Sequence, residues 1–357
     1  MKYTELSITD GCGKDFKQLL GTDLPIIQAP MAGVQGSALA IAVSEAGGLG
    51  SLPCAMLSPE QLDSEIKLIK VATSQPVNLN FFCHAMPALD EKKQAAWQAR
   101  LKPYFDELGI EADSLPAGTS RTPFNHATAD LLEAYKPEII SFHFGLPSNE
   151  LMARIKGWGT KVLSTATTLK EAVWLEAQGV DAIIAQGLEA GGHRGMFLSA
   201  DITTQVGLAA LVPQIVSQVK VPVIAAGGIA DAKGVQAALL LGATAVQVGT
   251  AYLLCNEANT SQLHRAALKS IQAAHTALTN IFTGRPARGI VNRAIKELGY
   301  ISETAPDFPY ASIEMGKLRS AAEKNNSADF SPLWAGQNPS GCKEISAGEL
   351  TKQLAGF

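Results

Sequence analysis

The sequence predicts a (β/α)₈ TIM barrel, an α/β fold of eight parallel strands with helices between them, and a smaller cap after the eighth strand. Three observations support this prediction. Short apolar runs recur along the chain, and each is followed by turn residues and a helical pattern. The runs are continuous rather than alternating, as expected of parallel strands buried on both faces. An open doubly wound sheet shows the same local pattern, but the count of eight favours the barrel.

The expected elements follow one another along the chain. Glycine ends the helical stretch Ser37–Ala46, and GGLGSL then begins the second strand. Further helices are expected at Leu169–Gln178 and Ala232–Leu241. A charged, aromatic helix is expected between Leu89 and Leu108, followed by an irregular segment to Phe124. The eight expected strands are Leu24–Met31, Gly47–Leu52, Val77–Phe82, Glu138–Gly145, Lys161–Ala166, Asp181–Gly187, Val221–Gly227 and Ala245–Thr250.

The alternation of strands and helices stops after the eighth strand. Asn256–Asn280 is polar and helical, and Ile281–Ile313 is irregular, so we expect a cap packed over one end of the barrel. Two later helical patterns, Ser312–Lys324 and Glu344–Ala355, are expected to complete the outer helical layer. The expected division is residues 1–257 and 312–357 for the barrel and residues 258–311 for the cap.

Composition excludes several classes of protein. With 46% apolar and 17% charged residues, the 357-residue chain is too apolar to be disordered. Its 29 basic and 33 acidic residues give a net charge of −4, without the basic face of a nucleic-acid-binding protein. We read no secretory signal in the first residues, and Ala237–Leu254 resembles a buried helix and strand more than a membrane span. Five scattered cysteines without C-x-x-C indicate reduced thiols in a cytoplasmic protein.

Polar residues at the ends of the expected strands are the candidates for chemistry, because TIM-barrel active sites lie at that end. These residues are uncharged and rich in amides and glycine, which suits a flat heteroaromatic ring and a phosphate better than a metal ion. The sequence has no H-E-x-x-H motif or carboxylate cluster, so we predict no metal, and it has no G-x-S-x-G motif. The strand-end residues are Gln28, Ala29, Pro30, Met31, Asn80, His143, Thr165, Gln186, Gly227, Gly228, Gln247, Val248, Gly249 and Thr250.

Strands seven and eight both end in glycine, in AAGGIAD and QVGTA. Glycine lets the backbone approach a ligand closely, and free N–H groups at such turns bind anions. The loops after these two strands are the usual phosphate site of the fold. The two turns therefore predict a phosphate site, although ordinary turn glycines are the alternative.

The segment after strand six, AQGLEAGGHRG, holds the candidate for acid–base chemistry. His193 follows a strand end and can take up or release a proton near neutral pH. A surface histidine in a mobile loop is the alternative interpretation. His143 alternates with Phe142 and Phe144 in SFHFG, so it is a weaker candidate, and a structural barrel histidine is nearly as well supported.

These segments together resemble the flavin-dependent nitronate monooxygenases, formerly called 2-nitropropane dioxygenases. The matching pieces run in the family's order from about Pro25 to Asn292, and AQGLEAGGHRG is specific to this group and its near relatives. The pieces are PIIQAPMAGV, GGLGSL, VNLNFF, AQGLEAGGHRG, PVIAAGGIAD, GATAVQVGTAY and GRPARGIVN.

The resemblance implies a TIM barrel that binds FMN noncovalently and oxidises alkyl nitronates, such as propionate 3-nitronate, with O₂ to a carbonyl product and nitrite. It implies that His193 is the base, which deprotonates a neutral nitroalkane or orients a nitronate that is already deprotonated. The residues implied to bind FMN are Pro30, Met31, Asn80, Gln186, Gly191, Gly227, Gly228, Gln247, Val248, Gly249 and Thr250.

The resemblance also implies a substrate pocket that contains His143, Tyr310 and Lys317. We hypothesise that Lys317 or Arg194 pairs with a substrate carboxylate. The expected partners are a nitronate and O₂, without nucleic acid or membrane, and the expected state is a monomer or homodimer.

Other functions stay open at this point. An FMN- and NAD(P)H-dependent enoyl-[acyl-carrier-protein] reductase shares the barrel and a very similar EAGGH loop, and an NAD(P)H:quinone reductase is a related alternative. The glutamine in AQGLEAGGH and the extended tail favour the monooxygenase. A flavin-binding barrel without turnover is a third reading. An inosine-monophosphate-dehydrogenase-like barrel needs a nucleophilic cysteine in a Gly/Ser-rich loop, and none of the five cysteines has that setting.

Overall fold

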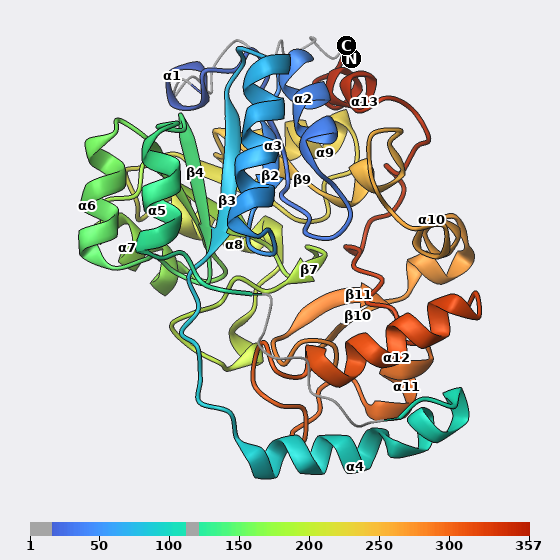
Figure 1. Ribbon diagram of the computed structural model, residues 1–357. Coiled ribbons are helices and arrows are strands. Elements are labelled where there is room, and N and C mark those ends of the chain that lie inside the picture. Colours follow the sequence, from blue (N-terminus) through green and yellow to red (C-terminus); the bar gives the residue numbers. More distant parts are fainter. Residues whose placement is uncertain (1–15, 112–120) are drawn as a thin grey trace.

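The computed structural model describes residues 16–111 and 121–357. The eight expected strands form one parallel sheet in the order β1-β9-β8-β6-β5-β4-β3-β2 (Figure 1). A parallel bridge between Ile27 of β1 and Leu49, which precedes β2, joins the two ends of the sheet and closes it, so the barrel prediction is confirmed. The strands are β1 (Ile26–Gln28), β2 (Gly50–Pro53), β3 (Val77–Phe82), β4 (Ile139–His143), β5 (Lys161–Ala166), β6 (Ala182–Gln186), β8 (Val223–Ala226) and β9 (Ala245–Val248).

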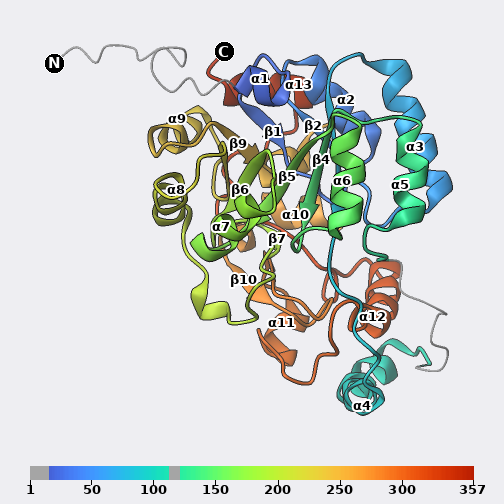
Figure 2. The same ribbon diagram turned by 90° about the vertical axis from the view of Figure 1, so that its left-hand side faces the viewer.

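Helices surround the strands (Figure 2). Side-chain caps fix where several of them begin: Ser58 accepts a hydrogen bond from the backbone of Gln61 at the start of α3, and Asp231 accepts one from Gly234 at the start of α9. The helices around the barrel are α2 (Ser37–Glu45), α3 (Pro59–Ala72), α5 (His126–Glu133), α6 (Asn149–Gly157), α7 (Leu169–Ala177), α8 (Leu208–Val216), α9 (Ala232–Leu240) and α13 (Ala347–Leu354).

The strands are packed on both faces, which explains their continuous apolar runs. Inside the barrel, Ile27, Leu163 and Ile224 form one cluster, which Leu20 of α1 (Phe16–Leu20) joins. Outside it, a larger cluster lies between the strands and the surrounding helices. Both faces of the sheet therefore contribute to stability.

A second lobe lies next to the barrel, at the bottom of Figure 1. Its centre is an antiparallel sheet in the order β10-β11-β7, where β7 belongs to the segment that follows strand β6. Trp97, Ile281, Leu298 and Phe330 lie in its separate apolar cluster. The elements of the lobe are α4 (Glu91–Leu108), β7 (Gly192–His193), α10 (Gln262–Lys269), β10 (Thr276–Thr279), β11 (Ala287–Ile290), α11 (Arg293–Leu298) and α12 (Ser312–Lys324), and 3₁₀ turns occur at η1 (Ile202–Thr204), η2 (Thr250–Leu254) and η3 (Ile271–Ala274).

The sequence predicted this lobe poorly. The stretch Asn256–Asn280 was expected to be helical, but only α10 and η3 are, and the stretch ends in strand β10. The region Ile281–Ile313, expected to be irregular, contains β11 and α11. Strand β10 is stabilised by its pairing with β11 from later in the chain, and such pairing overrides the local polar composition.

The two C-terminal helices have different positions. Helix α13 packs against α2 and α9 and completes the outer layer, as expected. Helix α12 instead packs against α4, and its side chains Met315 and Leu318 belong to the apolar cluster of the second lobe. The division at residues 258–311 stays a prediction, and we propose that α4 and α12 be grouped with the cap.

No helix within 16–111 or 121–357 is long and apolar enough to cross a membrane. The stretch Ala237–Leu254 contains a helix and a strand as expected, because α9 ends at Leu240 and β9 begins at Ala245. The first residues, where no secretory signal was read, and most of the irregular segment before Phe124 lie outside the described residues.

Candidate active site

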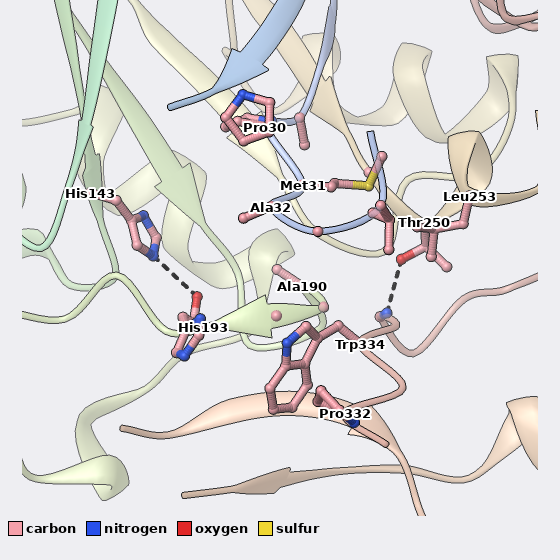
Figure 3. A pocket seen from close by; sticks show the side chains of 18 of the residues that line it. Pro30, Met31, Ala32, His143, Ala190, His193, Thr250, Leu253, Pro332 and Trp334 are labelled. Atoms are coloured by element: carbon pink, nitrogen blue, oxygen red, sulfur yellow. Dashed lines mark hydrogen bonds between the residues drawn. The ribbon is translucent and has the colours of Figure 1, made fainter. Parts of the chain in front are cut away.

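A cavity of about 290 Å³ lies where the C-terminal ends of the barrel strands meet the second lobe. It has a glycine end, formed by the turns after β8 and β9, and a histidine end, formed by His143, His193 and their aromatic neighbours (Figure 3). The sequence-predicted site residues that line it are Pro30, Met31, Asn80, His143, Gln186, Gly191, His193, Gly227, Gly228, Gln247, Val248, Gly249 and Thr250.

The glycine end is made largely of backbone. Gly227 and Gly228 have φ angles of +123° and +70°, which residues other than glycine rarely adopt. Gly249 follows β9 and begins the 3₁₀ turn η2, and a Cβ atom there would lie 3.3 Å from the Cβ of Ala29. The two turns thus present bare backbone to the cavity, as an anion site requires.

Residues 335–341, which precede α13 and are called the C-terminal tail below, cover this end, and the sequence did not predict this. The backbone N–H of Gly336 donates to Thr250 Oγ1 at 2.9 Å, as Figure 3 shows, and the Asn338 side chain donates to the carbonyl of Gly228 at 3.0 Å. A Cβ atom at Gly341 would lie 2.3 Å from the carbonyl oxygen of Ala230, so the tail passes against the turn after β8. The only sequence signal is the presence of Gly336 and Gly341 themselves.

Gln247 supplies a polar atom without a protein partner. Its Oε1 is buried and has no hydrogen-bond partner among the described residues, although it lies on the cavity wall. An unpaired buried acceptor is costly, so its position fits a ligand that offers an N–H group. Asn80 also lines the cavity, and it is fixed because its amide nitrogen donates to the side chain of Ser141 at 2.9 Å.

His193 is held by strand pairing and not by a mobile loop. It lies in β7, which pairs with β11 at Ala287, and the next backbone N–H, that of Arg194, donates to the carbonyl of Pro286 at 2.8 Å. Gln186 holds the same segment, since its amide donates to the His193 carbonyl at 2.9 Å and accepts from the Gly195 N–H at 2.8 Å. Both polar atoms of Gln186 therefore position the histidine strand.

His143 supports the same strand from the barrel side. Its Nε2 lies 3.3 Å from the His193 carbonyl oxygen, which can only accept, so we place the ring proton on Nε2 (Figure 3). Its Nδ1 then accepts from Thr165 Oγ1 at 3.1 Å. Burial lowers the pKa of His143 to about 3, and it is neutral at physiological pH.

The pKa of His193 is also held well below its usual value. Burial is the main cause, and the positive charge of Arg121 is the next, followed by His143, Arg285 and His84. A neutral imidazole results, and this is the form that accepts a proton. No carboxylate is among these causes.

Aromatic rings enclose the histidine. The ring centroids of Phe308, Trp334 and Phe144 lie 5.6, 5.7 and 6.0 Å from that of His193. Phe82 and Trp334 line the cavity, and so does Arg121. None of these residues was predicted as part of the site. Phe82 ends β3 and Phe144 follows β4, whereas Arg121, Phe308 and Trp334 come from loops that are far apart in the chain and carry no motif.

Three predicted contacts are not found at the cavity. Tyr310 and Lys317 are not among the lining residues, and the Tyr310 hydroxyl donates to the carbonyl of Pro87 at 3.0 Å. Their role in substrate binding stays a prediction.

Arg194 is fully buried, and its guanidinium donates to Gln205 and to the carbonyls of Gln186 and Gly187, so the hypothesis that it binds substrate is wrong. Adjacent residues of an extended strand point to opposite sides, which takes Arg194 away from the cavity that His193 lines.

A family model described as nitronate monooxygenase matches residues 14–356 of this chain. The chain belongs to the nitronate monooxygenase family. A nitronate monooxygenase of Pseudomonas aeruginosa is 41% identical over 95% of this chain and 97% of its own length. A probable nitronate monooxygenase of Bacillus subtilis is 38% identical over 95% of this chain and 97% of its own length.

Solved structures agree with this family assignment. A nitroalkane oxidase from Streptomyces ansochromogenes is 38% identical, with a TM-score of 0.87 over 95% of this chain and 96% of its own. FabK from Thermotoga maritima is 26% identical, with a TM-score of 0.70 over 95% of this chain and 93% of its own. The barrel and the second lobe are thus shared with these proteins.

Nitronate monooxygenases are flavin-dependent oxidoreductases, and this cavity fits a flavin on two observations. The unpaired Gln247 Oε1 suits an N–H group at the edge of the flavin ring, and the glycine end leaves backbone free for a phosphate. The described residues contain no group of three or more His, Cys, Asp or Glu side chains that could hold a metal ion.

Proposed function

We propose that this member of the nitronate monooxygenase family binds FMN and oxidises alkyl nitronates with O₂ to a carbonyl product and nitrite. The observation that carries the proposal is the position of His193, a neutral imidazole on a fixed strand that lines the same cavity as the glycine turns. The flavin, when bound, supplies the redox chemistry, and the protein supplies binding, orientation and electrostatics.

The cofactor residues divide into two groups. The backbone of Gly227, Gly228, Gly249 and Thr250 would hold the phosphate, and Gln247 would accept from the ring. Pro30, Met31, Asn80 and Gly191 would border the ring, since all of them line the cavity. Both polar atoms of the Gln186 side chain and the Nε2 of His143 are bonded to the segment that holds His193, so we assign these two residues to positioning His193.

His193 would act as the base towards a neutral nitroalkane. Its Nε2 lies 2.9 Å from Thr283 Oγ1, and we assign the Thr283 hydroxyl proton to the carbonyl of Arg285, 3.5 Å away. Thr283 then accepts from Nε2–H, which leaves Nδ1 of His193 unprotonated and able to take a proton from carbon. A nitronate has already lost that proton, so His193 would only bind and orient it.

The remaining expectations belong to the same proposal. The substrate partners would be a nitronate and O₂, and the enzyme would act in the cytoplasm. Its four described cysteines, Cys54, Cys83, Cys255 and Cys342, are free thiols, which suits a reducing compartment.

An anaerobic reduction experiment tests the proposal. FMN-loaded protein is mixed without oxygen, with ethyl nitronate in one experiment and with NADPH in a second, and the flavin absorbance is followed. We expect bleaching with the nitronate and none with NADPH. Rapid bleaching by NADPH would instead support a reductase, and no bleaching with either would support a flavin-binding barrel without turnover.

A further inference from the structure

Two buried charged side chains are bonded to the segment that carries His193, although neither lines the cavity. Arg194 is fully buried, and Glu171, in the first turn of α7, is 2% exposed. Two neutral side chains that are also buried, Gln205 and Thr167, lie between them and join them by hydrogen bonds. A buried charge is costly unless it is hydrogen-bonded, so these contacts stabilise both ions.

The carboxylate of Glu171 joins the turn after β5 to the segment that follows His193. Its Oε1 accepts from the backbone N–H of Phe197 at 2.6 Å and from that of Leu198 at 3.3 Å. Its Oε2 accepts from the backbone N–H of Thr167 at 2.7 Å and from the Thr167 hydroxyl at 2.8 Å. A carboxylate that receives all these donors is ionised, because a protonated one would itself have to donate.

The guanidinium of Arg194 holds the strand before this segment. Its Nε donates to Gln205 Oε1 at 2.8 Å, and its two Nη atoms donate to the carbonyls of Gly187 and Gln186, both at 2.7 Å. Burial lowers the pKa of Arg194 to about 10, which leaves it charged at neutral pH. Arg194 thus fixes the backbone of Gln186, the residue whose side chain in turn bonds to the His193 carbonyl.

The charges at the two ends fix the direction of each hydrogen bond between them. A carboxylate only accepts, so the Thr167 hydroxyl donates to Glu171 and accepts from the amide nitrogen of Gln205, 3.0 Å away. The amide oxygen of Gln205 then faces Arg194, which only donates. The four side chains, called the buried network below, therefore form one continuous chain of donors from Arg194 to Glu171, and the bonds of such a chain strengthen one another.

We infer that the buried network positions the base, by holding the segment around His193 against the barrel so that the imidazole faces the carbon from which it removes a proton. This inference rests on the proposed function, in which His193 is the base. Gln186 and His143 hold the carbonyl of His193 itself, and the network holds the chain on both sides of that carbonyl. Because its members do not line the cavity, they are positioning residues and not catalytic ones.

Substitutions at the two neutral links test the inference, because they leave both charges in place. Thr167→Val removes the hydroxyl at nearly constant size, and Gln205→Leu removes the amide. Each should lower kcat for neutral nitroethane about tenfold or more, as expected when a reacting group loses its alignment. KM for nitroethane, the turnover of preformed ethyl nitronate and the dissociation constant of FMN should stay near the wild-type values, because no member of the network lines the cavity.

Three further variants show whether the links act as one unit. Either substitution breaks the same chain, so Thr167→Val combined with Gln205→Leu should lower kcat no more than the stronger single variant. Thr167→Ser keeps the hydroxyl and should keep most of the wild-type rate. Thr203→Val is the matched control, because the Thr203 hydroxyl also donates to a carboxylate, that of Asp201 at 2.7 Å, but at the surface. It should leave kcat unchanged.

Hydrogen exchange provides a readout that needs no turnover. The amide N–H groups of Phe197 and Leu198 donate to Glu171, so mass spectrometry of a peptide that spans them should show faster exchange in both link variants. The wild type and the Thr203→Val control should exchange alike. Flavin content and melting temperature show whether each variant folds, and if Thr167→Val does not, Gln205→Leu and Thr167→Ser provide the same comparison.

The possible outcomes separate the inference from the proposed function. Folded link variants with an unchanged kcat for nitroethane, equal losses with nitroethane and ethyl nitronate, or multiplied losses in the double variant would each overturn the positioning role alone. A wild-type enzyme that oxidises neither substrate would refute the proposed function, and the exchange measurement would still decide whether the network holds the segment around His193.

Discussion

The two ends of the cavity are built in different ways. The glycine end consists of backbone at the ends of two adjacent barrel strands, with the tail bonded to it through Thr250 and Gly228. The histidine end consists of side chains, and its base stands on β7, a strand of the second lobe's sheet. One end is therefore a fixed surface for a cofactor, and the other is an arrangement of charges and rings.

This difference predicts that substitutions at the two ends change different quantities. At the glycine end, Gly227 and Gly228 have positive φ angles, and a Cβ atom added at Gly227 would lie 3.0 Å from the backbone nitrogen of Ala190, so we expect cofactor retention or stability to be affected. At the histidine end, side chains can be replaced with the fold intact, so the affected quantities are rate, pH dependence and substrate choice. The predictions below test this separation, beginning with the largest expected effect.

His193→Asn should affect the rate most. If His193 removes a proton from carbon, its loss should lower kcat/KM for neutral nitroethane about 10²- to 10⁴-fold. The loss for preformed ethyl nitronate should be much smaller, because that substrate needs no base. Steady-state oxygen consumption with the two substrates, at equal flavin content, measures this difference. Equal losses with both would show that His193 is not the base.

The pH profile of the wild type provides a further check on the same residue. Burial and the neighbouring positive charges hold the pKa of His193 well below its usual value of 6.5. Because the neutral form is the active base, kcat/KM for nitroethane should not fall as the pH is lowered through 6.5, and it should decline only at lower pH. An acid limb centred near 6.5 would contradict the buried, cationic environment of the ring.

The sequence predicted the glycine end better than the histidine end, and the reason is physical. Strand runs, the two glycine turns and the His193 loop are local patterns, and parallel strands bring their ends together without further information. Arg121 and Trp334 reach the cavity, and Phe308 reaches the His193 ring, through packing between segments far apart in the chain, which no local pattern records. The hypothesis that Arg194 binds substrate failed for a related reason. Arg194 is next to His193 in the sequence, but adjacent residues of a strand face opposite sides.

Gly191→Ala should have the next largest effect, on the cofactor. A Cβ atom at Gly191 would lie 2.5 Å from the backbone nitrogen of Gly336 and 2.6 Å from the carbonyl carbon of Ala335, so the tail would have to move. We expect a loss of about 1–3 kcal/mol in the free energy of unfolding and purified protein that retains little flavin. Denaturant unfolding and the ratio of flavin to protein absorbance measure the two effects.

Gly157→Ala serves as the control for this prediction. Gly157 ends helix α6, and no atom lies within 4 Å of the position where a Cβ would be added. Its stability and flavin content should stay close to the wild-type values. If Gly191→Ala behaved like this control, the tail would not be packed tightly against the segment that holds His193.

The smallest predicted effects come from the same substitution made once at each end. Thr250→Val removes the acceptor for the Gly336 N–H, and Thr283→Val removes the hydroxyl 2.9 Å from His193 Nε2. Each change deletes one hydrogen bond of a buried or half-buried group, worth about 1 kcal/mol, or roughly a fivefold change in an equilibrium or rate. Thr250→Val should raise the dissociation constant of FMN, and Thr283→Val should lower the ratio of nitroethane to nitronate turnover.

The two valine variants test the separation of the ends most strictly, because side-chain size and chemistry are matched. Thr283→Val leaves Nε2–H of His193 without its acceptor, so the ring can rotate or exchange its tautomer and present Nδ1 less often. Only a step that needs the free Nδ1 should suffer, which is proton removal from the neutral nitroalkane. For each variant, fluorescence titration gives the dissociation constant of FMN, and kinetics with nitroethane and ethyl nitronate give the ratio of the two turnover rates. If Thr283→Val weakened FMN as much as Thr250→Val, the second lobe would be holding the cofactor as well as the base, and the two ends would form a single unit.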